Sequence, residues 1–135
     1  MFIDRSVGID LGTTNSEIAL LDPKTSSYLV GHPARQRRGR TPGPVESIKR
    51  KMGQQVKVHV GPNELLPEEV SSKILGELRD RMREHLSSKA PSGVEVRVDR
   101  AVITVPAYFD APQVEATRRA GELAALNVIG ILQEP

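Results

Sequence analysis

The chain has 135 residues, 38% of them aliphatic, aromatic or sulfur-containing and 27% charged, which fits one folded domain and excludes a disordered chain. It contains no cysteine, so disulfides, thiolate zinc sites and cysteine nucleophiles are excluded. Aromatic residues make up only 3%, too few for a surface that stacks the bases of single-stranded nucleic acid. No run of about 18 apolar residues predicts a membrane span, and the cysteine-free composition suits a reducing compartment, so we expect a cytoplasmic protein.

The net charge of +2 is unevenly distributed along the chain. Between residues 35 and 51 one acid, Glu46, stands against seven basic side chains: Arg35, Arg37, Arg38, Arg40, Lys49, Arg50 and Lys51. Such a block attracts phosphate groups, whether on a nucleotide, a nucleic acid or a lipid. We interpret residues 35–40 as an ordinary solvated loop, and give Lys49 a separate role below.

The first 22 residues predict a β-hairpin. Apolar residues alternate over residues 6–11, which predicts a strand, and residues 12–15 form a turn signal. Residues 17–21 predict the returning strand, which an Asp-Pro pair ends. The tip of this hairpin would have the sequence Gly-Thr-Thr-Asn.

Residues 23–66 are rich in glycine and proline and predict a small subdomain of short elements. Among these are a short helix over 45–52 and a strand over 56–60. A long helix is predicted over 66–86, because apolar residues recur every four positions at Val70, Ile74, Leu78, Met82 and Leu86. Acidic residues at 68 and 69 suit the positive end of its dipole.

The last third of the chain predicts a strand, a helix and another strand. Residues 100–105 form an apolar, β-branched run that ends at Pro106, typical of a strand buried on both faces. Asp110 is a good N-cap, and Gln113 three positions later completes a capping-box pattern. The helix should run to about Ala125, with Asn127 ending it, before a strand over 128–132. This order predicts an α/β layer architecture.

Residues 10–15, Asp-Leu-Gly-Thr-Thr-Asn, combine groups that suit phosphate binding. Asp10 ends a strand, where its carboxylate can face a ligand, and Gly12 lets the backbone approach a bulky anion. Hydroxyl, amide and backbone N–H donors follow at Thr13, Thr14 and Asn15. A carboxylate beside a phosphate site is typical of Mg²⁺, held directly or through water. From these six residues alone, an ordinary polar hairpin turn explains the pattern equally well.

Three longer segments belong together. They are VGIDLGTTNS at residues 7–16, SIKRKMG at 47–53, and AVITVPAYF at 101–109, which continues through Gln113, Thr117 and Gly121 to the final Gln-Glu-Pro. In this order they resemble the heat-shock 70 kDa (Hsp70, DnaK-like) chaperones, and VGHPA at 30–34 resembles a further family segment. The first segment is shared across the actin-like superfamily, whereas the second and third are specific to Hsp70s. The resemblance covers nearly the whole chain.

The resemblance implies an α/β fold, the first lobe of an actin-like (ribonuclease H-like) ATPase domain. That lobe has a mixed sheet with flanking helices and a small inserted subdomain. Here the core lobe would comprise residues 1–22 and 100–135, and the inserted subdomain about 23–99. The second phosphate loop, the adenine pocket and the peptide-binding domain have no counterpart in this sequence, so we expect it to be a fragment.

The resemblance also implies ATP or ADP with Mg²⁺ as ligands, and gives roles to individual residues. Lys49 would contact the γ-phosphate and help to place the attacking water. Glu134 would orient that water as the acid/base carboxylate, and Asp10 would hold Mg²⁺ through water. Pro106 would relay the nucleotide state as a conformational switch. The first phosphate-binding hairpin would consist of Gly12, Thr13, Thr14 and Asn15, with Thr13 among the catalytic residues.

A full-length protein of this kind would hydrolyse ATP as a stress-response chaperone that assists protein folding. Its partners would be unfolded peptides, a J-domain co-chaperone and a nucleotide-exchange factor, with no membrane and no nucleic acid. The isolated chain holds one wall of the cleft, so we expect it to hydrolyse ATP negligibly. We also expect it to self-associate through a sheet face that an intact domain would cover.

One departure from the family pattern concerns coupling. Val114 stands where the family has an arginine after the glutamine, and Asp110-Ala111-Pro112 replaces Asn-Asp-Ala. This departure affects the predicted coupling between nucleotide site and substrate domain, not ATP binding. The region between residues 21 and 30 is also short, which predicts a compact member of the family.

Three other interpretations stay open. Another actin-like ATPase, such as a bacterial actin or a sugar kinase, is disfavoured by Tyr108-Phe109 and by Ile48-Lys49-Arg50. A basic module that binds nucleic acid through residues 35–51 is disfavoured by the low aromatic content and the lack of a helix-turn-helix or zinc pattern. A non-catalytic, truncated interaction protein with an inherited fold is not separated from the ATPase by sequence.

Overall fold

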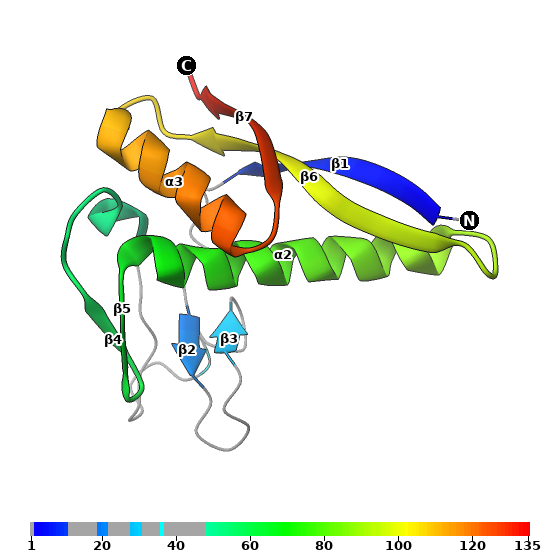
Figure 1. Ribbon diagram of the computed structural model, residues 1–135, viewed down its shortest axis with the longest axis horizontal. Helices are drawn as coiled ribbons and strands as arrows, with labels where there is room; N and C mark the ends of the chain where they lie inside the picture. Colours follow the sequence, from blue (N-terminus) through cyan, green and yellow to red (C-terminus); the bar gives the residue numbers. More distant parts are fainter. Residues whose placement is uncertain (1, 11–18, 22–27, 31–35, 37–47) are drawn as a thin grey trace.

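The computed structural model describes residues 2–10, 19–21, 28–30, 36 and 48–135 (Figure 1). The first part contains β1 (Phe2–Asp10), β2 (Ala19–Leu21), β3 (Tyr28–Val30), the 3₁₀ helix η2 (Ile48–Lys51), β4 (Val58–Val60) and β5 (Asn63–Leu65). The second part contains α2 (Pro67–Lys89), β6 (Glu95–Val105), α3 (Ala111–Leu123) and β7 (Asn127–Gln133). The predicted α/β class is confirmed. No helix within the described ranges is long and apolar enough to cross a membrane.

The main sheet has the order β1-β6-β7, with both neighbouring pairs parallel. The central strand is β6, where Ile103 pairs with Ile9 on one side and Ile131 on the other. Parallel neighbours need a crossover, and α3 supplies it between β6 and β7. The strands therefore bring their carboxyl ends to the same edge, where Asp10 of β1 pairs with Thr104 of β6.

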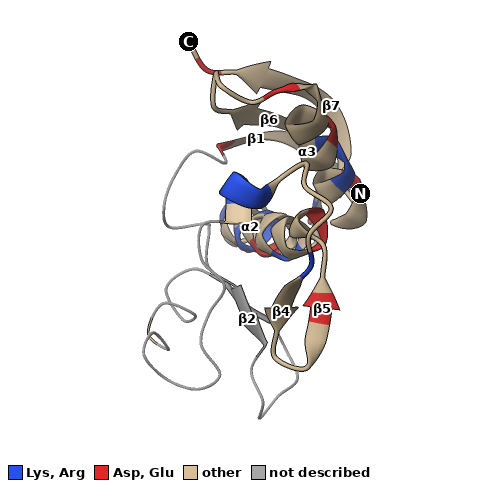
Figure 2. Cartoon of the chain, turned by 90° about the vertical axis from the view of Figure 1, so that its left-hand side faces the viewer, with Lys and Arg blue, Asp and Glu red and all other residues tan. Residues whose placement is uncertain are grey.

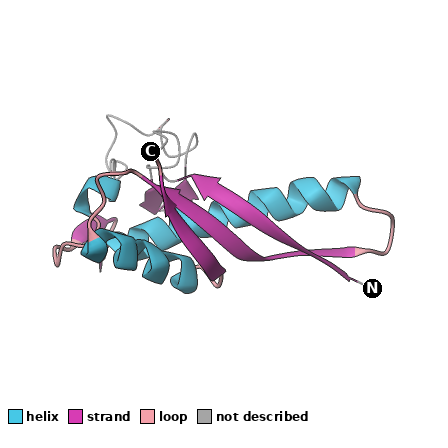
Figure 3. Ribbon diagram, turned by 90° about the horizontal axis from the view of Figure 1, so that it is seen from above, coloured by secondary structure: helices cyan, strands magenta, loops and turns pink. Residues whose placement is uncertain are grey.

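Both long helices cover one face of this sheet (Figures 1 and 3). Strand β6 alternates over residues 101–105, so that Ala101, Ile103 and Val105 are buried in the core under the helices, while Val96 and Val98 are buried nearer the start of the strand. Alanines on α3 allow the helix to come close. Gly121 allows it closer still, because a Cβ there would lie 2.4 Å from Val128 Cγ2. Burial of this face supplies the main core.

The short elements pack on the N-terminal half of α2. Strands β4 and β5 form an antiparallel hairpin, and Val58 and Val60 of β4 are buried with Val70 and Ile74 of α2. Ile48 of η2 joins the same small cluster. Helix α2 therefore serves two cores at once, since its next residue, Leu75, is buried in the main core.

The ends of α3 follow from local chemistry. The predicted capping box is present: the Gln113 N–H donates to Asp110 Oδ1 at 2.9 Å, and the Asp110 N–H donates to Gln113 Oε1 at 2.8 Å. The helix ends at Leu123, before the predicted Ala125, because Ala125 has a φ of 61°. The Leu126 N–H then closes the turn on the Gly121 carbonyl at 2.9 Å.

The predicted hairpin over the first 22 residues is wrong. Strand β2, which was expected to return along the first strand, pairs antiparallel with β3 in a separate two-stranded sheet. Within the described residues the main sheet is accordingly parallel and not mixed. Apolar alternation identifies a strand, but it does not select the strand's partner. The predicted hairpin tip, residues 12–15, lies outside the described residues.

Several boundaries also differ from the predictions, among them the end of the long helix, which continues to Lys89. The strand expected to start at residue 100 begins at Glu95, and its first residues pair with Phe2 to Asp4 of β1. The main sheet thus includes residues 95–99, which the prediction assigned to the inserted subdomain. The short helix predicted over 45–52 is a single 3₁₀ turn, Ile48–Lys51, within the described range.

Candidate functional site

The carboxyl edge of the main sheet brings two acidic residues together. Asp10 is the last residue of β1, and the Thr104 hydroxyl of β6 donates to Asp10 Oδ1 at 3.1 Å. Glu134 follows β7, and its backbone N–H donates to the Val105 carbonyl at 2.9 Å. The parallel pairing therefore extends to the residue that carries the second carboxylate. A switch to loops at the carboxyl ends of parallel strands is where α/β proteins place ligands.

The pKa of Glu134 is raised above its ordinary value of 4.5 by this arrangement. The largest cause is a hydrogen bond with Asp10, followed by the negative charge of Asp10 and by loss of water around the carboxyl group. The charge of Lys49 and a hydrogen bond with Thr104 lower the same pKa by less. Two carboxylates this close resist simultaneous ionisation, so the edge favours a shared proton or a nearby cation.

Lys49 reaches this edge from a distant part of the sequence. It stands on η2, where its neighbour Ile48 is buried in the small cluster and Met52 is buried in the main core. The Ser71 hydroxyl of α2 also donates to Met52 Sδ at 3.3 Å. Lys49 itself is half-buried, and Figure 2 shows η2 in blue beside α2 and below the end of β1. Its two anchored neighbours thus direct the lysine toward the acidic pair.

This edge fits a divalent cation that is held through water. No group of three or more His, Asp or Glu that could bind a metal directly occurs in the described part of the chain. Asp10 and Glu134 still offer oxygen acceptors at one place, with the Thr104 hydroxyl beside them. Mg²⁺ keeps several of its waters and needs only one or two carboxylates besides phosphate oxygens. These residues would therefore suit a hydrated Mg²⁺.

Comparison with known proteins decides the family. Residues 36–135 match the family described as Hsp70 protein. This chain belongs to the Hsp70 family. The chaperone protein DnaK of Mycoplasmopsis agalactiae is 39% identical to it over 150 aligned positions, which include 96% of this chain and 24% of the relative. Those of Mycoplasma mobile and Thermotoga maritima are each 37% identical over 153 positions, with 98% and 96% of this chain covered and 24% of each relative.

The chain spans about a quarter of the length of the curated relatives that it matches. The alignments are also longer than the 135 residues of the chain, so these Hsp70 relatives contain residues without a counterpart here. This difference in length is in the direction expected for a compact family member.

Part of the predicted Hsp70 site is described. The structure brings Asp10, Lys49 and Glu134 to one edge and places the predicted switch, Pro106, directly beside it. The predicted phosphate-binding residues lie outside the described ranges: Gly12, Thr13, Thr14 and Asn15. Four arginines of the basic block also lie outside the described ranges: Arg35, Arg37, Arg38 and Arg40.

Pro106 is buried at the start of the connection from β6 to α3. The Phe109 N–H donates to the Pro106 carbonyl at 3.1 Å, and Gln133 Nε2 donates to the Phe109 carbonyl at 2.7 Å. This short segment is therefore fastened to the residue that precedes Glu134. Val114, which replaces the arginine of the Hsp70 pattern, is half-buried and packs against the main core.

Sequence reasoning missed Thr104 as a site residue. A signal for it was present, because alternation in the run 101–105 places Thr104 on the face opposite Ile103 and Val105. Thr104 is a polar residue near the end of β6, just before Pro106, so it lies at the same sheet edge as the end of β1. The missing information was the register that pairs Thr104 with Asp10.

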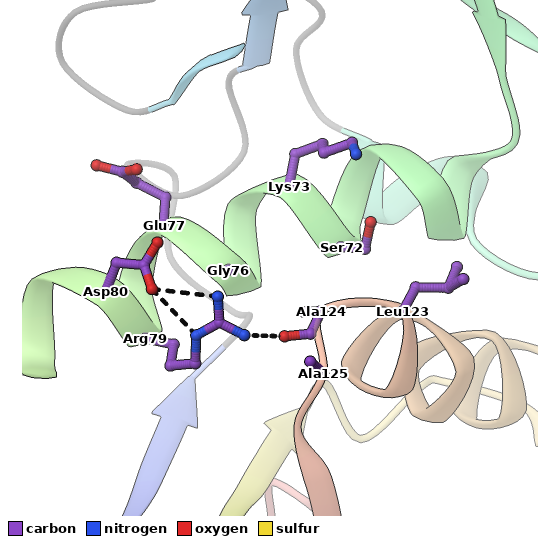
Figure 4. Close-up of a pocket in the computed structure, with 9 residues that line it drawn as sticks. All are labelled: Ser72, Lys73, Gly76, Glu77, Arg79, Asp80, Leu123, Ala124 and Ala125. Carbon is purple, nitrogen blue, oxygen red and sulfur yellow. Dashed lines mark hydrogen bonds and ion pairs between the residues drawn. The ribbon is translucent and has the colours of Figure 1, made fainter. Parts of the chain in front are cut away.

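A hollow lies between α2 and the end of α3, with a volume of about 330 Å³ (Figure 4). Arg79 of α2 crosses it: its guanidinium donates to the Ala124 carbonyl and pairs with Asp80 at 3.1 Å. A cation that contacts the last carbonyls of a helix stabilises the helix end. We therefore interpret Arg79 as a clamp between the two helices. The acidic edge lies near the opposite end of α3, where Asp110 caps it.

Proposed function

We propose that this chain forms the first wall of the Mg²⁺-nucleotide site of an Hsp70 ATPase domain. The whole protein would be an ATP-driven chaperone that assists protein folding in the cytoplasm. Unfolded peptides, a J-domain co-chaperone and a nucleotide-exchange factor would be its partners. The observation that carries the proposal is the convergence of Asp10, Glu134 and Lys49 at one sheet edge from three separate segments.

The proposed roles follow from the chemistry of these groups. Phosphoryl transfer requires mainly positioning and neutralisation of charge. Lys49 would supply a fixed positive charge to the γ-phosphate, while Glu134 would accept a hydrogen bond from the attacking water. Asp10 would hold waters of the Mg²⁺ shell. The cation would neutralise charge on the phosphates, and the hairpin with Thr13 would bind the phosphate oxygens.

The arrangement favours a nucleotide over a nucleic-acid backbone. Lys49 is half-buried beside two carboxylates, whereas its basic neighbours Arg50 and Lys51 are exposed. Carboxylates repel a polyanion that approaches without a divalent cation. A nucleotide that brings Mg²⁺ with it removes this conflict, so the mixed charges are explained by one ligand.

The test is a chimera in which this chain replaces the matching quarter of the Thermotoga maritima DnaK. We expect the chimera to hydrolyse ATP in single-turnover experiments, whereas the 135-residue chain alone hydrolyses it negligibly. Lys49→Ala in the chimera should lower the rate by about 10²–10³-fold, since one preorganised charge is lost from the transition state. Nucleotide binding should change far less.

Arg50→Ala is the matched control, because it removes the same charge from an exposed neighbouring position. It should leave hydrolysis nearly unchanged. Equal losses in the two variants would show that Lys49 acts only through the general charge of the basic block. A folded chimera that binds no nucleotide would contradict the proposed function itself.

A further inference from the structure

Gly53 ends the turn that carries Lys49. The Met52 N–H donates to the Lys49 carbonyl at 3.3 Å, and the Gln54 N–H donates to the Lys51 carbonyl at 3.1 Å. Between these two bonds Gly53 has a φ of +81°, in the left-handed region where glycine has no steric cost. The end of η2 is therefore a tight turn whose exit direction depends on this residue.

The backbone of Gly53 is seated on the first turn of α3. A Cβ at this position would lie 3.1 Å from the Gln113 nitrogen, 3.2 Å from the Pro112 carbonyl carbon and 3.3 Å from Gln113 Cα. All three are backbone atoms, so no side chain can rotate away to make room. The Gln113 N–H is already bonded to Asp110 Oδ1, which fixes this turn further.

The same turn of α3 is connected to the acidic edge. Phe109 precedes the cap residue, and its carbonyl accepts from Gln133 Nε2 at 2.7 Å. The next residue after Gln133 is Glu134, whose backbone N–H is bonded to Val105. One short segment, residues 106–113, thus contacts both the turn that follows Lys49 and the strand end that carries Glu134.

We propose that Gly53 is a positioning residue for Lys49. Its close seating on Pro112 and Gln113 sets how far the Lys49 amine reaches toward Asp10 and Glu134. A side chain at position 53 would push the turn away from α3 and carry η2 with it. The consequence for hydrolysis rests on the proposed function, whereas the geometric part stands without it.

A simpler account is that position 53 needs glycine only for its backbone angle. Gly93 separates the two accounts. It has nearly the same angle, a φ of +83°, in the connection between α2 and β6, but a Cβ there would meet nothing within 4 Å. Gly53→Ala and Gly93→Ala therefore share the cost of a left-handed alanine, and only the first adds a contact with α3.

Zero-length carbodiimide cross-linking of the 135-residue chain, read by mass spectrometry, measures the geometry directly. The unmodified chain and Gly93→Ala should form an amide between Lys49 and Glu134 or Asp10. In Gly53→Ala the yield should fall to the background of a Lys49→Gln chain. An unchanged yield in folded Gly53→Ala overturns the proposal, and so does an equal loss in Gly93→Ala.

Asparagine variants keep the test decisive if the alanine variant does not fold. Asn tolerates the left-handed angle better than Ala but still carries a Cβ, so Gly53→Asn should also lose the cross-link while Gly93→Asn keeps it. In the chimera, Gly53→Asn should lower single-turnover hydrolysis by roughly 10²-fold, because a misplacement of about 1 Å in a catalytic group has such an effect. Loss of the cross-link with hydrolysis unchanged would support the positioning of Lys49 and contradict its proposed catalytic role.

Discussion

The two faces of the main sheet are built from the same three strands and differ in almost every other respect. One face is covered by α2 and α3, and its β6 residues are fully buried, Ile103 and Val105 among them. On the opposite face no described helix lies (Figure 3), Val102 and Thr104 are half-buried, and Leu132 is 59% exposed. Strand β6 thus contributes to stability with one set of alternate residues and to the candidate site with the other.

This difference explains where a site can form without weakening the core. The pleat separates Thr104 from Ile103 although the two are adjacent in sequence. The hydroxyl that contacts Asp10 therefore has no desolvation cost in the main core. An acidic pair at the end of the uncovered face stays close to solvent, which a hydrated cation requires.

The largest effect expected from this comparison concerns neighbouring residues of β6. Ile103→Ala removes a completely buried side chain from the covered face and should lower the free energy of unfolding by about 2–5 kcal/mol. Val102→Ala, on the other face, should lower it by less than about 1 kcal/mol because its side chain is only half-buried. Urea unfolding followed by circular dichroism measures both. Equal losses of unfolding free energy would mean that the face opposite α2 and α3 is covered as well.

The sequence predicted this core better than it predicted the pairing. A continuous β-branched run identified β6, the four-residue recurrence of apolar side chains identified α2, and the capping box fixed the start of α3 at Asp110. The partner of β2 was missed, because alternation carries no information on which strand lies beside it. The start of β6 was missed because the prediction rested on the continuous apolar run 100–105, whereas residues 95–99 continue the strand with Val96 and Val98 alternating with charged residues.

For the site, residue types were predictable and distances were not. Asp10, Lys49 and Glu134 came from motif resemblance, and neither the basic block nor a terminal acid alone would have distinguished them. Their convergence depends on tertiary contacts: the burial of Met52, the seating of Gly53 on α3, and the β1–β6 register. No local pattern encodes these contacts, which is also why Thr104 was missed.

A second, smaller effect concerns association of the chain with a copy of itself. Leu132 and Ile129, 59% and 53% exposed, lie on β7, the edge strand of the main sheet. Apolar area of this kind favours a partner, so we expect sedimentation velocity to show a concentration-dependent dimer. Leu132→Asn should weaken it. Leu123→Asn is the matched control, since Leu123 is equally exposed but lies on α3. A monomer at all concentrations, or equal effects of both variants, would contradict association through this face.

The smallest expected effect tests the acidic pair through its pH dependence. The pKa of Glu134 in the fold is raised above 4.5, so between 4.5 and that raised pKa the folded chain binds more protons than the unfolded chain. The free energy of unfolding must then fall as pH rises through this window. Glu134→Gln removes the titration. It should match the unmodified chain at about pH 4 and be slightly more stable at about pH 7.

Glu122→Gln, an exposed position on α3, controls for the loss of one negative charge. Urea unfolding of the three proteins at both pH values gives the comparison. If Glu134→Gln is instead less stable at neutral pH, the attraction of Lys49 outweighs the repulsion from Asp10. The Glu134 carboxylate would then act mainly as the ion-pair partner of Lys49.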